Sequence, residues 1–325
     1  MEGEEEMSGV NKAKPSTECQ PSFTRGLRAL TYRELRKWLK DPVMLTMFVL
    51  QPLIWMGLLG KSINIRGLFS AENINLPRQI PIPGNAILHP PGVEGVVLDG
   101  ATFSRLLADM SAGVMQSAFG VADYFSFMAV GVVSMMVTTT TMFSGMSIVW
   151  DRRLGFLDKV ISTPVPRAAI IFAKIFNATL RSLIQATVIL ALAYLLGLRV
   201  SPTFTPLNIL GVYAAIFLMG AGLSSVFIAF SIRSTRIEKP MQFASLITMP
   251  LVFASNTFFP TKFMPGWMQT VASINPLTYL TDAIRQLTIL PTDTQALIWD
   301  FICLSIFAAA LTTIGVVLSW KYLSR

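Results

Sequence analysis

The sequence has few charged residues, two cysteines and one histidine, and each scarcity excludes a class of protein. Charged residues make up 14% of the 325 residues, whereas a soluble domain has roughly 25%, so a soluble globular fold does not describe the whole chain. Cys19 lies in a polar tail and Cys303 in an apolar run, and we do not expect them to pair. His89 would have to build any histidine-based metal site or Ser-His-Asp triad alone, and we interpret it as a solvated loop residue.

Two further motifs are missing. Gly60-Lys61-Ser62 resembles the end of a phosphate-binding loop, but Trp55 stands where the first glycine of that loop belongs. We therefore predict that this motif binds no nucleotide. A basic stripe with interleaved aromatic residues, which nucleic-acid binding would require, is also absent outside the segments that flank the apolar runs. We expect no nucleic-acid partner.

Apolar residues, by contrast, are abundant. They form 53% of the chain, and its mean hydropathy is +0.58. About 20 apolar residues are needed to cross a bilayer as a helix, and the sequence predicts an all-α membrane protein with six spans. They cover residues 43–60, 122–150, 168–197, 207–232, 241–259 and 298–320. The acidic start does not resemble a signal peptide, so we expect the first span to act as its own insertion signal.

The distribution of lysine and arginine predicts the orientation. Most of the 26 basic residues fall on one side if both ends of the chain lie there, and cytoplasmic loops carry such an excess. We therefore expect a multi-pass protein of the cell membrane with both termini in the cytoplasm. Residues 1–22 are predicted to be a disordered cytoplasmic tail, and residues 61–121 an extracytoplasmic loop. Attraction to anionic membrane lipids fits the net charge of +8.

Residues 23–41 have the pattern of an amphipathic helix that lies in the membrane interface. Apolar residues fall on one face, with Trp38 at head-group depth, and basic residues, among them Arg28, Arg33 and Arg36, fall on the other. Glu34 is the exception, since it lies on the apolar side. Asp41-Pro42 is expected to end this helix and turn the chain into the bilayer.

The connector between the second and third spans, residues 150–174, is charged and marked by prolines. We predict a short cytoplasmic helix over 152–162, on which an external motor could push. After the fifth span, two apolar segments within 260–290 are each too short to cross. They predict a re-entrant helical hairpin, marked by Pro260, Asn275-Pro276 and Tyr279.

Polar residues inside the spans allow two interpretations. Gln51-Pro52 interrupts the first span, where a proline kinks a helix and suits either a moving element or a structural bend. The third span carries a stripe at helical spacing, which indicates either a transport pathway or gate, or an interhelical hydrogen-bond network. The stripe consists of Lys174, Asn177, Arg181 and Gln185.

From Arg25 onward the chain resembles the membrane subunits of ABC transporters of the type-2 (ABC-2) exporter class, especially the daunorubicin-resistance-like permeases. The order and spacing of several motifs carry the resemblance. They are the helix 23–41, Gln51-Pro52-Leu53-Ile54-Trp55, Asp123-Tyr124-Phe125, the blocks 151–159 and 163–167, Arg181 and Gln185, Phe259-Pro260, and Asn275-Pro276-Leu277-Thr278-Tyr279 with Asp282 and Arg285.

The resemblance implies a permease that exports an amphiphile, such as a drug, a lipid or a lipid-linked glycan. It implies a second permease subunit, identical or different, and a separate ABC ATPase subunit that binds ATP and Mg, so that this chain itself is neither an enzyme nor a cofactor carrier. The residues expected to couple to the ATPase are Asp151, Arg152, Arg153, Gly155, Phe156, Leu157 and Lys159. An ATP-independent carrier or channel, or a membrane-embedded enzyme, remains the alternative, and co-purification of an ATPase would distinguish them.

Overall fold

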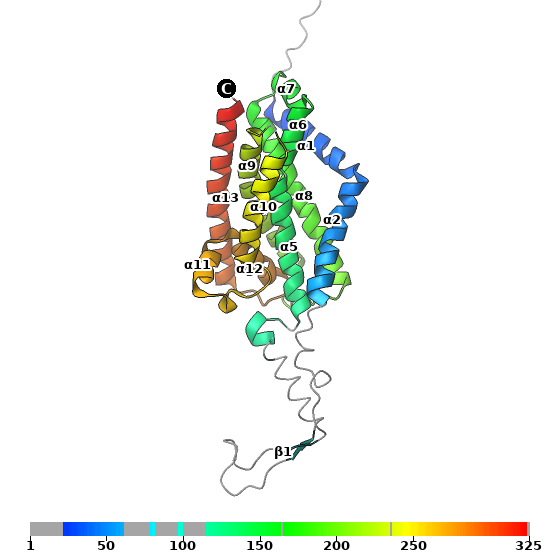
Figure 1. Cartoon of the computed structure of the whole chain (residues 1–325), viewed down its shortest axis with the longest axis vertical. Coiled ribbons are helices and arrows are strands. Elements are labelled where there is room, and N and C mark those ends of the chain that lie inside the picture. The colour runs from blue at the N-terminus through cyan, green and yellow to red at the C-terminus, as the bar shows by residue number, and fades with distance from the viewer. Residues whose placement is uncertain are drawn as a thin grey trace, which may run out of the picture.

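Helices dominate the part of the chain that the structure describes, as the sequence predicts (Figure 1). The computed structural model describes residues 22–61, 79–81, 97–99, 113, 115–121, 123–163, 165–234 and 236–323. Two three-residue strands, β1 (Gln79–Pro81) and β2 (Val97–Asp99), pair antiparallel. The predicted tail, except Ser22, and most of the predicted loop 61–121 lie outside the described residues, so those two predictions stay untested.

The described helices, in chain order, are α1 (Phe23–Leu39), α2 (Pro42–Trp55), a π-helical continuation (Met56–Lys61), α5 (Tyr124–Phe143), α6 (Met146–Arg153), α7 (Phe156–Ile161), α8 (Arg167–Leu195), α9 (Pro206–Ile232), α10 (Glu238–Phe253), the 3₁₀ turn η2 (Thr261–Phe263), α11 (Gly266–Ile274), α12 (Pro276–Thr288) and α13 (Thr294–Leu323). From α5 onward the helices follow one another with short connections, whereas most of the segment between Lys61 and α5 lies outside the described residues. In Figure 1, α7 and the C-terminus lie at one end of the bundle, and α11 and α12 lie at the other.

Five helical stretches are long and apolar enough to cross a membrane. They correspond to five of the six predicted spans and cover Pro42–Gly60, Met115–Arg153, Arg167–Leu195, Pro206–Ile232 and Thr294–Tyr322. The helix at the position of the predicted fifth span is α10, whose 16 residues reach only about 24 Å at 1.5 Å per residue. A typical hydrocarbon core is about 30 Å thick. The structure therefore supports five spans by length, and α10 falls short of a full one.

The core of the bundle lies around α9, which packs against α8, α13, α12 and α5. Small residues allow these close approaches: a Cβ atom added to Gly131 of α5 would lie 2.1 Å from the carbonyl oxygen of Thr257, and one added to Gly145 would lie 2.6 Å from that of Phe227. The absence of a side chain at these two glycines thus permits close packing. Helices α2 and α13 lie at opposite edges of the bundle and are mostly exposed.

Residues at helix starts show why the elements begin where they do. The side chains of Asp41 and Asp123 accept hydrogen bonds from the backbone N–H groups of Met44 (3.1 Å) and Ser126 (2.9 Å), so each caps a helix N-terminus. Asp41-Pro42 ends α1 and starts α2, as the sequence predicts. Pro52 lies inside α2, where it lacks a backbone N–H, and the helix changes to π geometry four residues later.

Candidate functional site

The buried face of α1 differs from the predicted apolar face. Thr31, Glu34 and Trp38 are buried against the rest of the bundle, and α1 packs on α8. Glu34, which the pattern treats as an exception, is 4% exposed and lies at the centre of that face. Phe23 and Leu39, assigned to the apolar face, are 39% and 51% exposed. The physical reason is that α8 offers α1 a partner that is charged rather than apolar.

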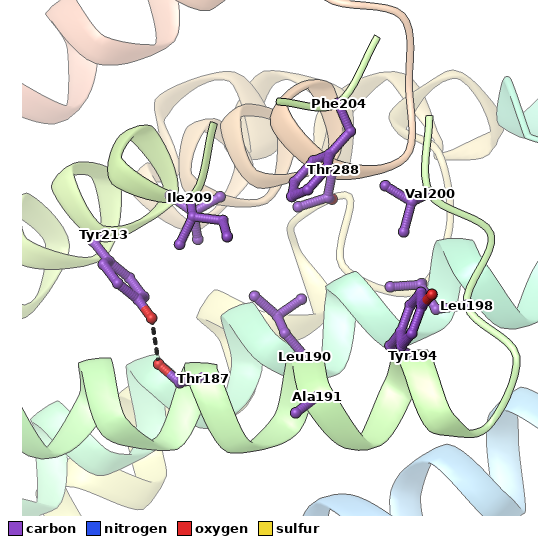
Figure 2. A pocket seen from close by; sticks show the side chains of 11 residues that line it. Thr187, Leu190, Ala191, Tyr194, Leu198, Val200, Phe204, Ile209, Tyr213 and Thr288 are labelled. Carbon is purple, nitrogen blue, oxygen red and sulfur yellow. Dashed lines mark hydrogen bonds between the residues drawn. The ribbon is translucent and has the colours of Figure 1, made fainter. Parts of the chain in front are cut away.

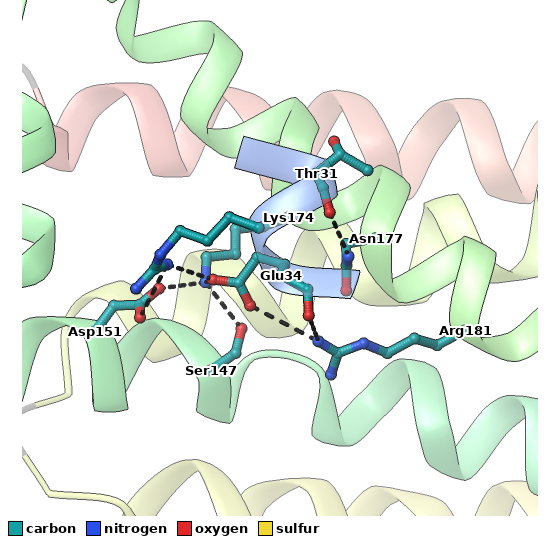
Figure 3. Close-up of polar contacts among 8 residues, drawn as sticks. Thr31, Glu34, Ser147, Asp151, Lys174, Asn177 and Arg181 are labelled. Atoms are coloured by element: carbon teal, nitrogen blue, oxygen red, sulfur yellow. Dashed lines mark hydrogen bonds and ion pairs between the residues drawn. The ribbon is translucent and has the colours of Figure 1, made fainter. Parts of the chain in front are cut away.

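That partner is Lys174, the first residue of the polar stripe of α8. Its Nζ atom lies 3.0 Å from Oε1 of Glu34, forms a short ion pair with Asp151 of α6 and lies 3.3 Å from the hydroxyl of Ser147 (Figure 3). The side chains of Lys174, Glu34 and Asp151 are 8%, 5% and 2% exposed. Three separate segments, α1, α6 and α8, therefore meet in one buried ion-pair network. We call Glu34, Asp151, Lys174, Arg33 and Arg181 the ion-pair network.

Two arginines complete this network from its sides. Arg33 of α1 lies 3.0 Å from Glu34 and 3.8 Å from Asp151. Arg181 lies 3.7 Å from the Glu34 carboxylate and donates a hydrogen bond of 3.2 Å to the Glu34 carbonyl oxygen. The guanidinium of Arg181 also lies 5.7 Å from the ring centroid of Trp38. The cost of burying two carboxylates is thus offset by three cations.

The remaining residues of the stripe also bond to other helices. Asn177 donates to the carbonyl oxygen of Thr31 (3.3 Å), and Gln185 accepts a short hydrogen bond from Thr140 of α5. Both side chains are buried. All four stripe residues therefore face helices of the same chain, a geometry that favours the interhelical network over a pathway lining. In α2, Gln51 is exposed and Pro52 is buried.

Electrostatics keeps Glu34 ionised despite its position. Burial raises the pKa of the Glu34 carboxyl, but the charges of Lys174, Arg181 and Arg33 and the hydrogen bond from Lys174 outweigh burial, so the pKa lies below its ordinary value of 4.5. The carboxylate is charged at neutral pH. It can then hold α1 to α8 as an ionic link.

The predicted coupling helix 152–162 is two helices. Helix α6 ends at Arg153 and α7 starts at Phe156, because Gly155 adopts a left-handed conformation with φ of 65° and breaks the helix. A Cβ atom at Gly155 would meet nothing within 4 Å, so the glycine serves the backbone turn rather than packing. The boundaries predicted for one continuous helix are corrected by this break.

The predicted coupling residues divide into exposed and buried ones. Arg152, Arg153 and Lys159 are exposed, and the neighbouring Leu154 is 68% exposed. Asp151 and Leu157 are buried, so neither presents its side chain to a docking surface.

Two further contacts fix this turn to the bundle. Arg152 donates a hydrogen bond of 2.9 Å to the carbonyl oxygen of Ile232, the last residue of α9. Phe156 lies beneath Arg33, whose guanidinium is 3.4 Å from the ring centroid. The turn is thereby anchored to α9 and α1.

The basic residues of α1 divide into two that point away from the ion-pair network, Arg28 and Arg36, and one that takes part in it, Arg33. Arg28 and Arg36 are exposed, while the Arg33 side chain is 38% exposed. These positions fit the predicted basic face. The position of the whole helix in a membrane interface stays a prediction.

The predicted hairpin region contains η2, α11 and α12, and Asn275 joins it to α10. The Asn275 side chain caps α12 by accepting from Leu277 N–H (3.0 Å), and its amide donates to the carbonyl oxygens of Leu251 (2.7 Å) and Ala254 (2.8 Å). Pro276 follows as the first residue of α12, a position that proline favours. Tyr279 donates to the carbonyl oxygen of Ser273 (2.5 Å), and Pro260 precedes η2.

One buried cation in α12 was part of the family resemblance but had no assigned role. Arg285 is 2% exposed and donates to the carbonyl oxygens of Asn256 (2.8 Å), Thr257 (2.9 Å) and Phe127 (3.3 Å). Its guanidinium lies 3.5 Å from the ring centroid of Phe127. Arg285 thus joins α12 to α5 and to the turn after α10. Within the described ranges, no group of three or more histidine, cysteine, aspartate or glutamate residues could hold a metal ion.

Comparison with known proteins gives matches that cover most of the chain. The family model described as ABC-2 type transporter matches residues 25–289. The putative transport permease ycf38 of Cyanophora paradoxa is 24% identical over 280 residues, which cover 86% of this chain and 79% of that protein.

Two similar proteins have names that refer to drugs. The daunorubicin resistance ABC transporter permease protein DrrB1 of Streptomyces coeruleorubidus is 27% identical over 165 residues, covering 51% of this chain and 58% of that protein. The probable multidrug ABC transporter permease YbhR of Escherichia coli (strain K12) is 27% identical over 169 residues, covering 51% of this chain and 44% of that protein. The chain thus aligns with about half the length of these two relatives.

Proposed function

Because this chain belongs to the ABC-2 type transporter family, we propose that it is the membrane subunit of an ATP-driven exporter whose ATPase is a separate chain. The family makes the chain a transport permease. The ATPase would bind ATP and Mg, and this chain would receive the force. The printed names of two relatives, which refer to daunorubicin resistance and multidrug transport, support an amphiphilic substrate such as a drug, a lipid or a lipid-linked glycan.

One observation carries the proposal: the turn between α6 and α7 has an exposed tip, and a residue that precedes this tip is buried in an ion pair. Arg153 and Leu154 are exposed at the tip. That residue, Asp151, pairs with Lys174 of α8 in the ion-pair network. A partner protein can therefore bind the tip through the charge of Arg153 and the apolar side chain of Leu154. A displacement of the tip would then be transmitted to α8 and α1 through the ion-pair network.

The test uses residues of the turn that are exposed and, within the described part of the chain, make no side-chain contact that stabilises the fold. Arg152 and Leu157 also hold the fold, so their substitution would mix lost coupling with lost stability. Arg153→Glu and Leu154→Asp change the exposed tip only. With the partner ATPase in lipid nanodiscs, both variants should hydrolyse ATP without the stimulation that substrate normally gives, and export in vesicles should fall at least tenfold.

Arg199→Glu is the matched control, because Arg199 is an exposed arginine in the connection between α8 and α9, at the opposite end of the bundle, in a surface ion pair of 3.8 Å. It should transport normally. Normal export by Arg153→Glu and Leu154→Asp would refute the role of the tip. Failure of any ATPase to co-purify with the native chain would favour an ATP-independent carrier.

We further propose six crossings, with α10 and the residues up to 259 as the fifth, and α11 and α12 as a hairpin that enters the non-cytoplasmic leaflet. Helix α10 packs against α5 and α9, which supports a place inside the bundle. With 9 and 13 residues, α11 and α12 are too short to cross. The basic residues around α7 and the C-terminus support a cytoplasmic position for that end, in the cell membrane.

We propose that two permease subunits, identical or different, form the transporter. Helix α10 supports this, because a surface groove of about 730 Å³ along it exposes Met241, Leu246 and Met249 by 51%, 72% and 63%. Cysteine at position 246 should cross-link two copies of the chain in native membranes if the subunits are identical and meet at α10, whereas cysteine at the exposed Ile306 of α13 should not.

A further inference from the structure

A second feature of the molecule lies far from the ion-pair network, at the opposite end of α8. It is a pocket of about 500 Å³ between α8, α9, their connection and α12 (Figure 2). Leu190 and Tyr194 of α8 face Phe204 and Thr288 across it.

Hydrogen bonds hold the wall of this pocket in place. Gly197, with φ of 106°, turns the chain at the end of α8. The connection is then fixed by a hydrogen bond of 2.9 Å from the Ser201 N–H to the carbonyl oxygen of Thr288. On the other side, the Asn208 amide donates to the carbonyl oxygen of Leu287 (3.0 Å). Because α12 bonds both to the connection after α8 and to the start of α9, the protein itself holds the pocket in shape without a ligand.

The lining selects for hydrocarbon. It contains no charged side chain, and three of its four hydroxyl groups have partners within the protein: those of Thr187 and Tyr213 bond to each other at 2.7 Å, and that of Thr288 donates to the carbonyl oxygen of Ile284 (2.6 Å). The fourth, that of Tyr194, lies on a side chain that is exposed at the rim. A sugar or a charged group would lose its own hydrogen bonds to water without replacement. The pocket lies within the last three turns of α8 and about the first two turns of α9, at one end of two helices that are long and apolar enough to cross a membrane.

We propose that this pocket binds one hydrocarbon chain of a membrane phospholipid from the leaflet opposite α7. A cavity of about 150 Å³ holds a benzene molecule, and 500 Å³ has room for about three times that bulk, as one acyl chain needs. Tyr194, which is 66% exposed at the rim, is of the residue type found at the level of lipid head groups. In the proposed orientation this is the outer leaflet, but the site itself does not depend on transport or on the ATPase.

The test uses the full-length protein in nanodiscs of phosphatidylcholine that contain a trace of the same lipid with a photoreactive diazirine on one acyl chain. After irradiation, mass spectrometry maps the adducts. We expect adducts on residues 187–213 to exceed those on the exposed face of α13, residues 302–317, at least fivefold.

Two substitutions should fill the pocket without disturbing the core. Ala191→Phe adds a ring from α8, and Val200→Trp adds one from the connection. Each should reduce the adducts on 187–213 to the level of α13. Ala310→Phe, an equal enlargement at an exposed position of α13, should leave them unchanged.

Other outcomes would overturn the proposal. Equal adducts on both surfaces would show ordinary contact with the bilayer and no site. Adducts that persist in both filled variants would place the bound chain elsewhere. A lack of adducts on 187–213 in the native protein would show that another protein surface, such as a second copy of the chain, covers the pocket.

Discussion

Replacement of Lys174 by methionine tests the central feature of the structure, the ion-pair network. Lys174 lies between Glu34 at 3.0 Å and Asp151, both nearly fully buried. Methionine keeps the bulk of the lysine side chain and removes only its charge and donors. The substitution therefore leaves two buried carboxylates without the buried cation between them, and Arg33 is then the cation that still lies near both.

The expected cost follows from what remains. Removal of one partner of a buried ion pair costs about 3–5 kcal/mol, because the other partner stays buried and uncompensated. Here Arg33 still lies 3.0 Å from Glu34 and 3.8 Å from Asp151, and Arg181 lies 3.7 Å from Glu34. We therefore expect the lower end of that range, about 3 kcal/mol, or roughly a hundredfold shift in the unfolding equilibrium.

Unfolding titrations with SDS in mixed detergent micelles, followed by tryptophan fluorescence, measure this change. Lys159→Met, an exposed lysine on α7, is the control and should change the free energy of unfolding by less than about 0.5 kcal/mol. Adding Asp151→Asn to Lys174→Met should recover about 1–2 kcal/mol, since it removes one stranded charge. If Lys174→Met is as stable as Lys159→Met, water screens the network and it does not hold α1 to α8.

Three further predictions use the same titration. Gly131→Ala should destabilise the protein by about 2 kcal/mol through the clash with the Thr257 carbonyl oxygen, whereas Gly57→Ala, where a Cβ meets nothing within 4 Å, should change stability by less than about 1 kcal/mol; equal effects would contradict the close packing of α5. Asn275→Ala, which loses the helix cap and both donors, should cost about 2–3 kcal/mol, and Asn275→Asp should cost at least as much, because it keeps the cap but turns a buried carboxylate oxygen toward two carbonyl oxygens; no loss in either would exclude the link to α10. Because the folded-state pKa of Glu34 lies below its unfolded value of about 4.5, its contribution is complete at neutral pH and is lost as the pH falls through the folded-state pKa; the acid-induced loss of stability should be smaller in Glu34→Gln, and an identical pH profile would refute this assignment.

Local signals predicted most of the helices. Apolar runs gave the positions of five spans, and Asp41 with Pro42 marked where α1 ends and α2 begins. These features depend on neighbouring residues along the chain, so one sequence contains the needed information. The length of α10 was overestimated, because the apolar pattern continues to Phe259 while the helix ends at Phe253, shortly after Pro250.

The partners of the polar stripe were not predictable in the same way. Lys174 and Glu34 are 140 residues apart in the chain, and only the packing of α1 on α8 brings them together. Two anomalies pointed to this contact: a carboxylate on the apolar face of one helix and cations on a span. Their complementary charges are consistent with a pair, but the sequence alone does not say which carboxylate meets which cation. The break at Gly155 was also visible as a glycine within a short helical pattern.

The ion-pair network also determines how a force on the α6–α7 turn would spread through the protein. Apolar surfaces can slide past each other with little change in energy, because the hydrophobic effect has no preferred direction. Separation of buried ion pairs near 3 Å raises the free energy of the protein steeply, because the carboxylates would be left without cations. We therefore expect α1, α6 and the half of α8 nearest α7 to move as one body, and we expect the bend to occur where the backbone next to that body has lost a helical hydrogen bond. Pro52 in α2 is such a place, since it removes a helical hydrogen bond four residues before the π-helical segment.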